Sequence, residues 1–144
     1  MRGIPGSGKS YTAKELVKNN EGVVFSTDEF FMVNETYKFN PKLIGKAHKW
    51  NQTRVETAML ENISNIVVDN TNTQHWEYEV YQTMAKKHGY DVKITYPTSS
   101  WWLDMQERIF NKSFTEDDIN ILEKKNTHGV PKDSIKKMMA RFEK

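Results

Sequence analysis

Residues 3–10 read Gly3-Ile4-Pro5-Gly6-Ser7-Gly8-Lys9-Ser10, and this stretch decides the fold. It fits the pattern G-x-x-x-x-G-K-[ST] of a P-loop, which wraps phosphate oxygens at the start of a helix. Glycines allow close backbone approach, the lysine charge lies between the β- and γ-phosphates, and the serine hydroxyl ligates Mg²⁺. A flexible glycine turn is the alternative, but an amphipathic helix follows where the motif requires one. The pattern predicts that ATP and Mg²⁺ bind at these residues: Gly3, Pro5, Gly6, Ser7, Gly8, Lys9, Ser10 and the adjacent Tyr11.

Only Met1 and Arg2 precede this motif, although a P-loop normally follows a buried apolar strand. We therefore expect the first strand of the sheet to be truncated. Either the sequence begins at an internal methionine of a longer reading frame, which we favour, or the domain does without this strand.

Composition excludes several classes of protein. The 144 residues, 28% charged and 37% apolar with a net charge of +2, are typical of one globular domain spanning 1–144 and not of a disordered chain. No apolar run reaches the roughly 18 residues of a membrane span, so we expect no membrane partner. The chain has no cysteine, which excludes disulfides and thiolate zinc sites and suits the cytoplasm or the nucleus.

The order of elements predicts an α/β fold, in which a parallel sheet is sandwiched by helices. Predicted strands are Val23–Ser26, Ile66–Asp69 and Val92–Tyr96. Predicted helices are Lys9–Asn19, Pro41–Asn62, Thr73–His88, Trp101–Asn111, Glu116–Lys125 behind a Thr115 cap, and Lys132–Glu143. The last three follow one another, so the C-terminal third is predicted to be helical.

Two carboxylates follow predicted strands, at the sheet edge where open α/β folds bind ligands. Asp28 follows the strand at Val23–Ser26, where it could take a proton from an attacking hydroxyl or simply cap a short helix. Asp69 ends Ile66-Val67-Val68-Asp69, which has the form of a Walker B strand whose carboxylate holds Mg²⁺ beside the P-loop serine. We predict Asp28 as the general base and Asp69, with Ser10, as the metal site.

Two basic residues are further candidates for the catalytic site. Arg54 falls within the apolar arc of its predicted helix, so it must either pair with a carboxylate such as Asp28 or reach the phosphate or acceptor. Lys125 lies in Lys124-Lys125-Asn126-Thr127-His128-Gly129-Val130-Pro131. Lysines here either complement a helix dipole or belong to a lid, at about residues 101–131, that closes over the transferring phosphate.

In this order, these motifs resemble the polynucleotide-kinase-like P-loop kinases over about Gly3 to Glu143. The likeness is greatest to the Nedd-four-binding-protein-two-like proteins, in STDEFF, YKFNPKLIGKAHKWNQTR, VVDNTNTQHWE and NTHGVPKDSIKKMMARFE. The resemblance implies ATP with Mg²⁺, Lys9 and Ser10 at the phosphates, Asp28 as base and a helical lid around Lys124 to His128. It also places the first strand between the third and fourth, so its absence would open the sheet at its middle.

The resemblance implies an ATP-dependent kinase that transfers the γ-phosphoryl group to a hydroxyl, with a polynucleotide 5′-OH as the leading acceptor and a nucleoside or other small alcohol behind it. This chain departs from the pattern of the phage-type polynucleotide kinases that it resembles. Their pattern has an arginine three places after the base, where this chain has Phe31. The alternative is a nucleotide-binding interaction module with little or no turnover.

Overall fold

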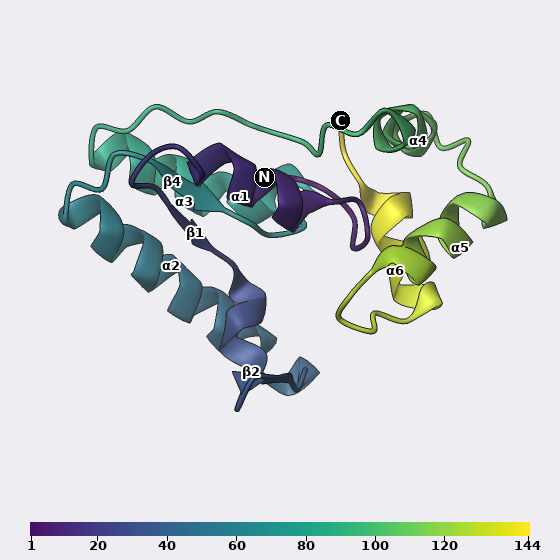
Figure 1. Cartoon of the computed structure of the whole chain (residues 1–144), viewed down its shortest axis with the longest axis horizontal. Coiled ribbons are helices and arrows are strands. Elements are labelled where there is room, and N and C mark those ends of the chain that lie inside the picture. Colours follow the sequence, from purple (N-terminus) through teal and green to yellow (C-terminus); the bar gives the residue numbers. More distant parts are fainter.

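A computed structural model describes all residues, 1–144, and shows an α/β arrangement (Figure 1). The helices are α1 Lys9–Val17, α2 Ile44–Leu60, α3 His75–Lys87, α4 Ser100–Phe110, α5 Glu116–Lys125 and α6 Lys132–Arg141. The strands are β1 Val23–Phe25, β2 Met32–Val33, β3 Thr36–Tyr37 and β4 Ile66–Val68. Two short 3₁₀ helices, η1 Thr27–Phe31 and η2 Pro41–Leu43, complete the chain.

Strands β1 and β4 form a parallel pair, with Val23 opposite Ile66 and Phe25 opposite Val68. Helices flank this pair, so the predicted class of a parallel sheet sandwiched by helices is confirmed. A second pair, the β2–β3 hairpin, has no counterpart in the sequence prediction. Its turn residues Asn34 and Glu35 have φ of 49° and 65°, the left-handed geometry of a tight hairpin turn.

The predicted strand at Val92–Tyr96 does not form; this segment has no regular secondary structure. A strand needs a neighbour along its whole length, and here Met1–Gly3 provides only isolated hydrogen bonds. The Met1 amino group donates to Val68 O at 2.9 Å, and Arg2 N donates to Thr95 O at 2.9 Å. Residues 1–2 therefore join the end of β4 to this segment, and the parallel sheet consists of β1 and β4 alone.

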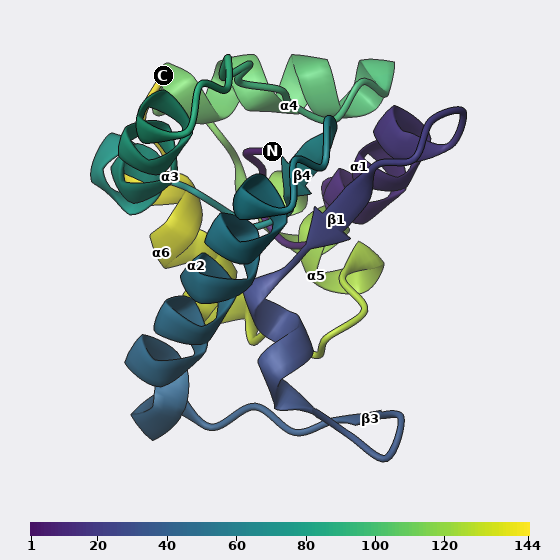
Figure 2. The same cartoon turned by 90° about the vertical axis from the view of Figure 1, so that its left-hand side faces the viewer.

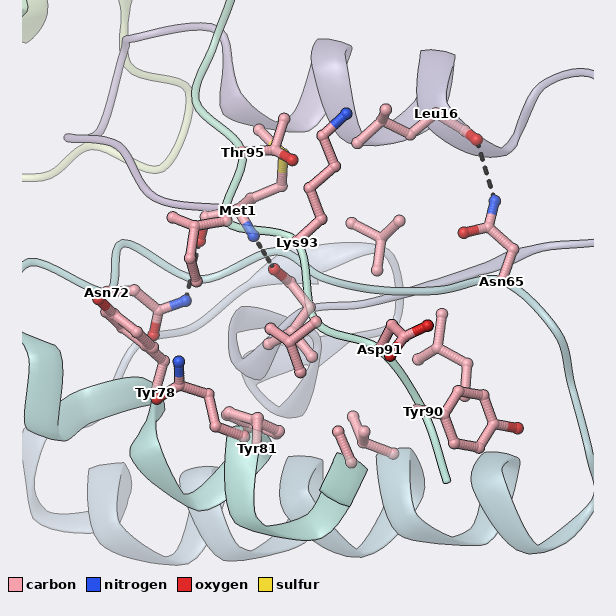
Figure 3. A pocket seen from close by; sticks show the side chains of 18 of the residues that line it. Met1, Leu16, Asn65, Asn72, Tyr78, Tyr81, Tyr90, Asp91, Lys93 and Thr95 are labelled. Carbon is pink, nitrogen blue, oxygen red and sulfur yellow. Dashed lines mark hydrogen bonds between the residues drawn. The ribbon is translucent and has the colours of Figure 1, made fainter. Parts of the chain in front are cut away.

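Next to Met1 lies a cavity of about 260 Å³ between β4 and the segment Asp91–Thr95 (Figure 3). Most of its lining is apolar and includes Val67 of β4 and Tyr81 of α3. On the opposite wall, Val92 and Ile94 are 50% and 38% exposed. This cavity occupies the place where the resemblance puts the first strand.

Buried side chains form two clusters, one at each end of the molecule. Near the sheet, α2 and α3 pack through Val55, Met59, Tyr81, Met84 and Ala85. At the other end, α4, α5 and α6 gather around a larger cluster: Ile4, Trp102, Met105, Ile109, Ile119, Leu122, Ile135, Met139 and Phe142 (Figure 1). Because the P-loop contributes Ile4 to this cluster, the C-terminal helices pack directly against the phosphate-binding turn.

The start of α5 follows its predicted cap. The Thr115 side chain accepts from Asp118 N at 3.3 Å, and Asp118 accepts from Thr115 N at 3.0 Å, a reciprocal capping box.

None of the helices has the length and apolar character needed to cross a membrane.

We expect an apolar segment placed before Met1 to fill the cavity and stabilise the protein. Five residues of a strand span about 17 Å, and each fully buried Val or Ile side chain contributes about 1.5–3 kcal/mol. A chain preceded by five Val and Ile residues should melt ~5–10 °C above one preceded by five Gly and Ser residues. It should also bind ATP more tightly, since the segment would fix the angle of the P-loop. Equal melting temperatures and affinities would show that the cavity accepts no strand.

Candidate functional site

The P-loop has the backbone geometry of a phosphate cradle. Gly6 and Gly8 have φ of 89° and 92°, the left-handed region that favours glycine. A Cβ atom on Gly6 would lie 2.5 Å from Leu122 O, so glycine here allows the last turn of α5 to pack on the loop. A Cβ on Gly8 would meet nothing within 4 Å. Gly8 therefore presents bare backbone to open space at the N-terminus of α1, where an anion is favoured.

Lys9, Ser10 and Asp69 converge as the sequence predicts. Ser10 Oγ donates to Asp69 Oδ2 at 2.8 Å, and Lys9 Nζ lies 3.6 Å from Asp69 Oδ1. Asp69 N donates to Phe25 O at 2.8 Å, which fixes the carboxylate at the end of β4. Asp69 is only 5% exposed.

These residues fit a nucleotide with Mg²⁺. Two buried oxygens, Ser7 Oγ and Asp69 Oδ1, have no hydrogen-bond partner within the chain. An unpartnered buried oxygen is costly unless a ligand satisfies it. Ser10 and Asp69 would hold the metal ion, with the cradle from Gly3 to Gly8 and the Lys9 ammonium at the phosphates.

Asp28 lies in η1, which follows β1, whereas Asp69 follows the neighbouring strand β4. The capping alternative does not hold, because Ser26 is the N-cap of η1 and its side chain accepts from Asp28 N at 3.3 Å. The Asp28 carboxylate faces two other groups. Tyr37 Oη donates to Asp28 Oδ1 at 3.3 Å, and His128 Nε2 lies 3.9 Å from Asp28 Oδ2. The side chain of Asp28 is 45% exposed, so an acceptor can reach it.

Tyr37 and His128 are the site residues that sequence reasoning missed. Tyr37 belongs to the unpredicted hairpin, and no motif indicates it. His128 stands in the lid string, but sequence alone shows no partner for it. Burial, followed by the charge of the Asp28 carboxylate, raises the pKa of Tyr37 above its ordinary value, so the phenol stays a hydrogen-bond donor at neutral pH.

Arg54 is held by partners at the start of η1. Its Nη1 donates to Glu29 Oε2 at 2.9 Å, and its Nη2 donates to Asn51 Oδ1 at 2.8 Å and Ser26 O at 3.2 Å. The guanidinium also lies 3.8 Å from the centroid of the Trp50 ring. These contacts support the structural alternative, with Glu29 as the carboxylate; a role for Arg54 at the phosphate stays a prediction.

Lys125 and Tyr11 are both exposed near the P-loop. The ammonium of Lys125 lies 4.7 Å from the centroid of the Trp101 ring, at the end of α5 that packs on Gly6. Tyr11 is 73% exposed in the first turn of α1. Their predicted roles at the nucleotide stay predictions.

Comparison with known proteins defines the class. A family model described as an AAA domain matches residues 1–144, the whole chain. The chain therefore belongs to this family of P-loop, kinase-like domains, in agreement with the resemblance of its motifs.

One curated relative is the human NEDD4-binding protein 2, which is 38% identical over 145 residues. The alignment covers 100% of this chain but 7% of that relative. The chain thus spans only a small part of the length of this relative.

We expect Lys9→Ala to abolish the stabilisation that MgATP gives the protein, because the charge over the phosphates would be lost. The measurement is the melting temperature with and without MgATP, and Lys14→Ala, one turn further along α1, is the matched control. An unchanged shift in the Lys9 variant would contradict the assignment of the P-loop.

Arg54→Met should cost about 1–3 kcal/mol of unfolding free energy, since the pair with Glu29 is only partly buried. Glu29→Gln should reproduce part of that loss. Chemical denaturation of both variants measures it, with phosphotransfer assayed on the folded fraction. A stable Arg54→Met protein with collapsed turnover would instead place the guanidinium at the phosphate.

Proposed function

We propose that this domain is an ATP-dependent phosphotransferase that moves the γ-phosphoryl group of ATP to a hydroxyl acceptor. The observation that carries the proposal is the placement of two carboxylates. Asp69 follows β4 directly and Asp28 follows β1 by three residues, and in the parallel pair the last residues of these strands, Val68 and Phe25, lie opposite each other. A buried carboxylate at the P-loop and an accessible one beside it suit a kinase.

The different surroundings of Asp69 and Asp28 suit these carboxylates to different roles in the reaction. Asp69 and Ser10 would hold the metal ion, which when bound would neutralise charge on the phosphates. Lys9 and the P-loop backbone orient the γ-phosphoryl group. Asp28 takes the proton of the acceptor hydroxyl while the hydroxyl oxygen bonds to phosphorus and ADP leaves. Lys125, on the lid, adds a positive charge near the loop.

A polynucleotide 5′-OH is the acceptor that we favour. The resemblance of the motifs supports it, and so do exposed lysines on the segment that follows Asp28. Lys38 and Lys42, which follow the hairpin in sequence, are exposed, and such cations suit an anionic acceptor with several phosphates. A nucleoside is the next candidate.

A nucleotide-binding interaction module is the second candidate function. The cavity between β4 and residues 91–95 favours it, because a P-loop beside an unfilled cavity can bind nucleotide yet hold it imprecisely. Formation of phosphorylated acceptor from labelled ATP, screened over RNA, DNA and nucleosides, separates the two functions.

Asp28→Asn should lower phosphotransfer ~10²- to 10⁴-fold and leave ATP affinity nearly unchanged, since a general base acts on the acceptor. Glu35→Gln, which removes an exposed carboxylate from the hairpin turn, is the control and should transfer normally. Persistent turnover in the Asp28 variant, or a collapse of ATP affinity, would contradict the role of Asp28 as base.

A further inference from the structure

Three segments far apart in the sequence meet at the carboxylate of Asp28. Tyr37 comes from β3, His128 from the loop between α5 and α6, and Asp28 from η1. The two contacts engage different oxygens, Tyr37 on Oδ1 at 3.3 Å and His128 on Oδ2 at 3.9 Å. The imidazole also packs on the phenol, with ring centroids 4.4 Å apart. The hairpin and the C-terminal helical region are thus joined across the candidate base.

The Tyr37 hydroxyl occupies the place that an acceptor hydroxyl needs. A general base must accept a hydrogen bond from the hydroxyl that it deprotonates. Asp28 Oδ1 already accepts one from Tyr37 Oη, in the same donor-to-carboxylate geometry. An acceptor hydroxyl that approaches the same lone pair of Oδ1 therefore competes with the phenol.

His128 is carried by a loop with a defined shape. The Asn126 side chain accepts from Val130 N at 2.8 Å and donates to Glu123 O at 2.7 Å, which ties together both ends of the loop. Asn126 N also lies 3.2 Å from the Cβ position of Gly6. The loop that places His128 on Asp28 is therefore seated on the P-loop.

The hairpin is the part of this arrangement that can move. It projects from the body of the molecule at the end of η1 (Figure 2), and β2 and β3 are two residues each. Met32 and Val33 are about half exposed, at 45% and 46%. The turn residues Asn34 and Glu35 and the adjacent Thr36 are exposed as well, which is typical of segments that open locally.

We propose that Tyr37 and His128 form a gate over Asp28. His128 is a positioning residue that orients the carboxylate from the P-loop side, and Tyr37 is the residue that an incoming acceptor displaces. A correct acceptor opens the gate because its other contacts offset the lost hydrogen bond, whereas water makes no such contacts. The gate thereby limits transfer of the γ-phosphoryl group to water. This inference rests on the proposed phosphotransferase function.

The first test is Tyr37→Phe, which removes the hydroxyl and keeps the ring. Loss of the competing hydrogen bond should lower the acceptor KM about 3- to 10-fold and raise hydrolysis of ATP by water by a similar factor. The KM for ATP should stay the same. Tyr78→Phe, in the cavity beside the sheet, is the matched control and should alter none of these values. Unchanged acceptor KM and hydrolysis in Tyr37→Phe would overturn the gate.

The second test concerns His128. His128→Ala should lower kcat for transfer about tenfold and raise the acceptor KM, with MgATP binding unchanged. His128→Gln, whose amide can still donate to Asp28, should recover part of both values. A residue that only stabilised the fold would lower the melting temperature without this split between acceptor and ATP. Normal acceptor kinetics in His128→Ala would overturn the positioning role.

The third test locks the gate. Because the chain has no cysteine, Tyr37→Cys with His128→Cys creates the only pair of thiols, which a short reducible bifunctional thiol reagent can bridge. The bridged protein should keep its MgATP thermal shift and lose transfer relative to the same protein after reduction. Equal transfer before and after reduction would overturn the gate.

Failure of the gate and failure of the proposed function give different results. Transfer by the wild-type protein with unchanged kinetics in Tyr37→Phe would overturn the gate alone. No transfer by the wild-type protein to RNA, DNA or nucleosides, with MgATP binding intact, would overturn the phosphotransferase function and the gate with it.

Discussion

The buried guanidinium of Arg2 is the constraint on which the rest of this structure depends. Arg2 is 2% exposed, and no carboxylate pairs with it. The guanidinium donates hydrogen bonds to three main-chain carbonyls instead: Asn72 O at 2.8 Å, Thr73 O at 3.0 Å and Glu143 O at 2.6 Å. It also donates to the Tyr96 hydroxyl at 2.9 Å. The rings of Tyr78, Tyr96 and Phe142 surround it at 5.1–5.6 Å. An uncompensated internal charge would be very costly, so all of these segments must assemble together.

These contacts of Arg2 explain how the P-loop keeps its place beside the β1–β4 sheet. Arg2 ties the residue before the loop to the segment after β4 and to the end of the chain beyond α6. Ile4 then enters the core of α4–α6, and Gly6 lies against the last turn of α5. The angle of the phosphate cradle is therefore set largely by the C-terminal helices, part of which the sequence suggested as a lid. Movement of those helices would move the cradle with them.

The parts of the fold that sequence predicted well are those specified by local chemistry. The glycines and Lys9 of the P-loop, Asp69 after a β-branched run and the Thr115 cap each depend on neighbours a few residues away. The strand predicted at Val92–Tyr96 does not form, because strand formation is decided by pairing and this segment has only the backbone bond from Arg2 N to Thr95 O. Arg54 could be placed on a buried face, yet its choice of Glu29 over Asp28 depends on the Ser26 capping box that turns Glu29 toward it. The Tyr37 contact depends on a hairpin turn made by Asn34 and Glu35. This turn contains no glycine, so the sequence pattern did not predict it.

The contrast between Asp28 and Asp69 assigns their chemistry better than their positions do. Asp69 is buried and fixed by Ser10 Oγ and by its backbone bond to β1, which suits a group that must keep its position beside a metal ion. Asp28 is 45% exposed and faces only Tyr37 and His128, at distances of 3.3 Å and 3.9 Å that are long for strong hydrogen bonds. A base must change both its partner and its protonation state in each cycle, and only weakly held partners permit that. For the phosphotransferase that we propose, the fold thus provides a rigid carboxylate for the donor, directly after β4, and an adaptable one for the acceptor, in η1 after β1.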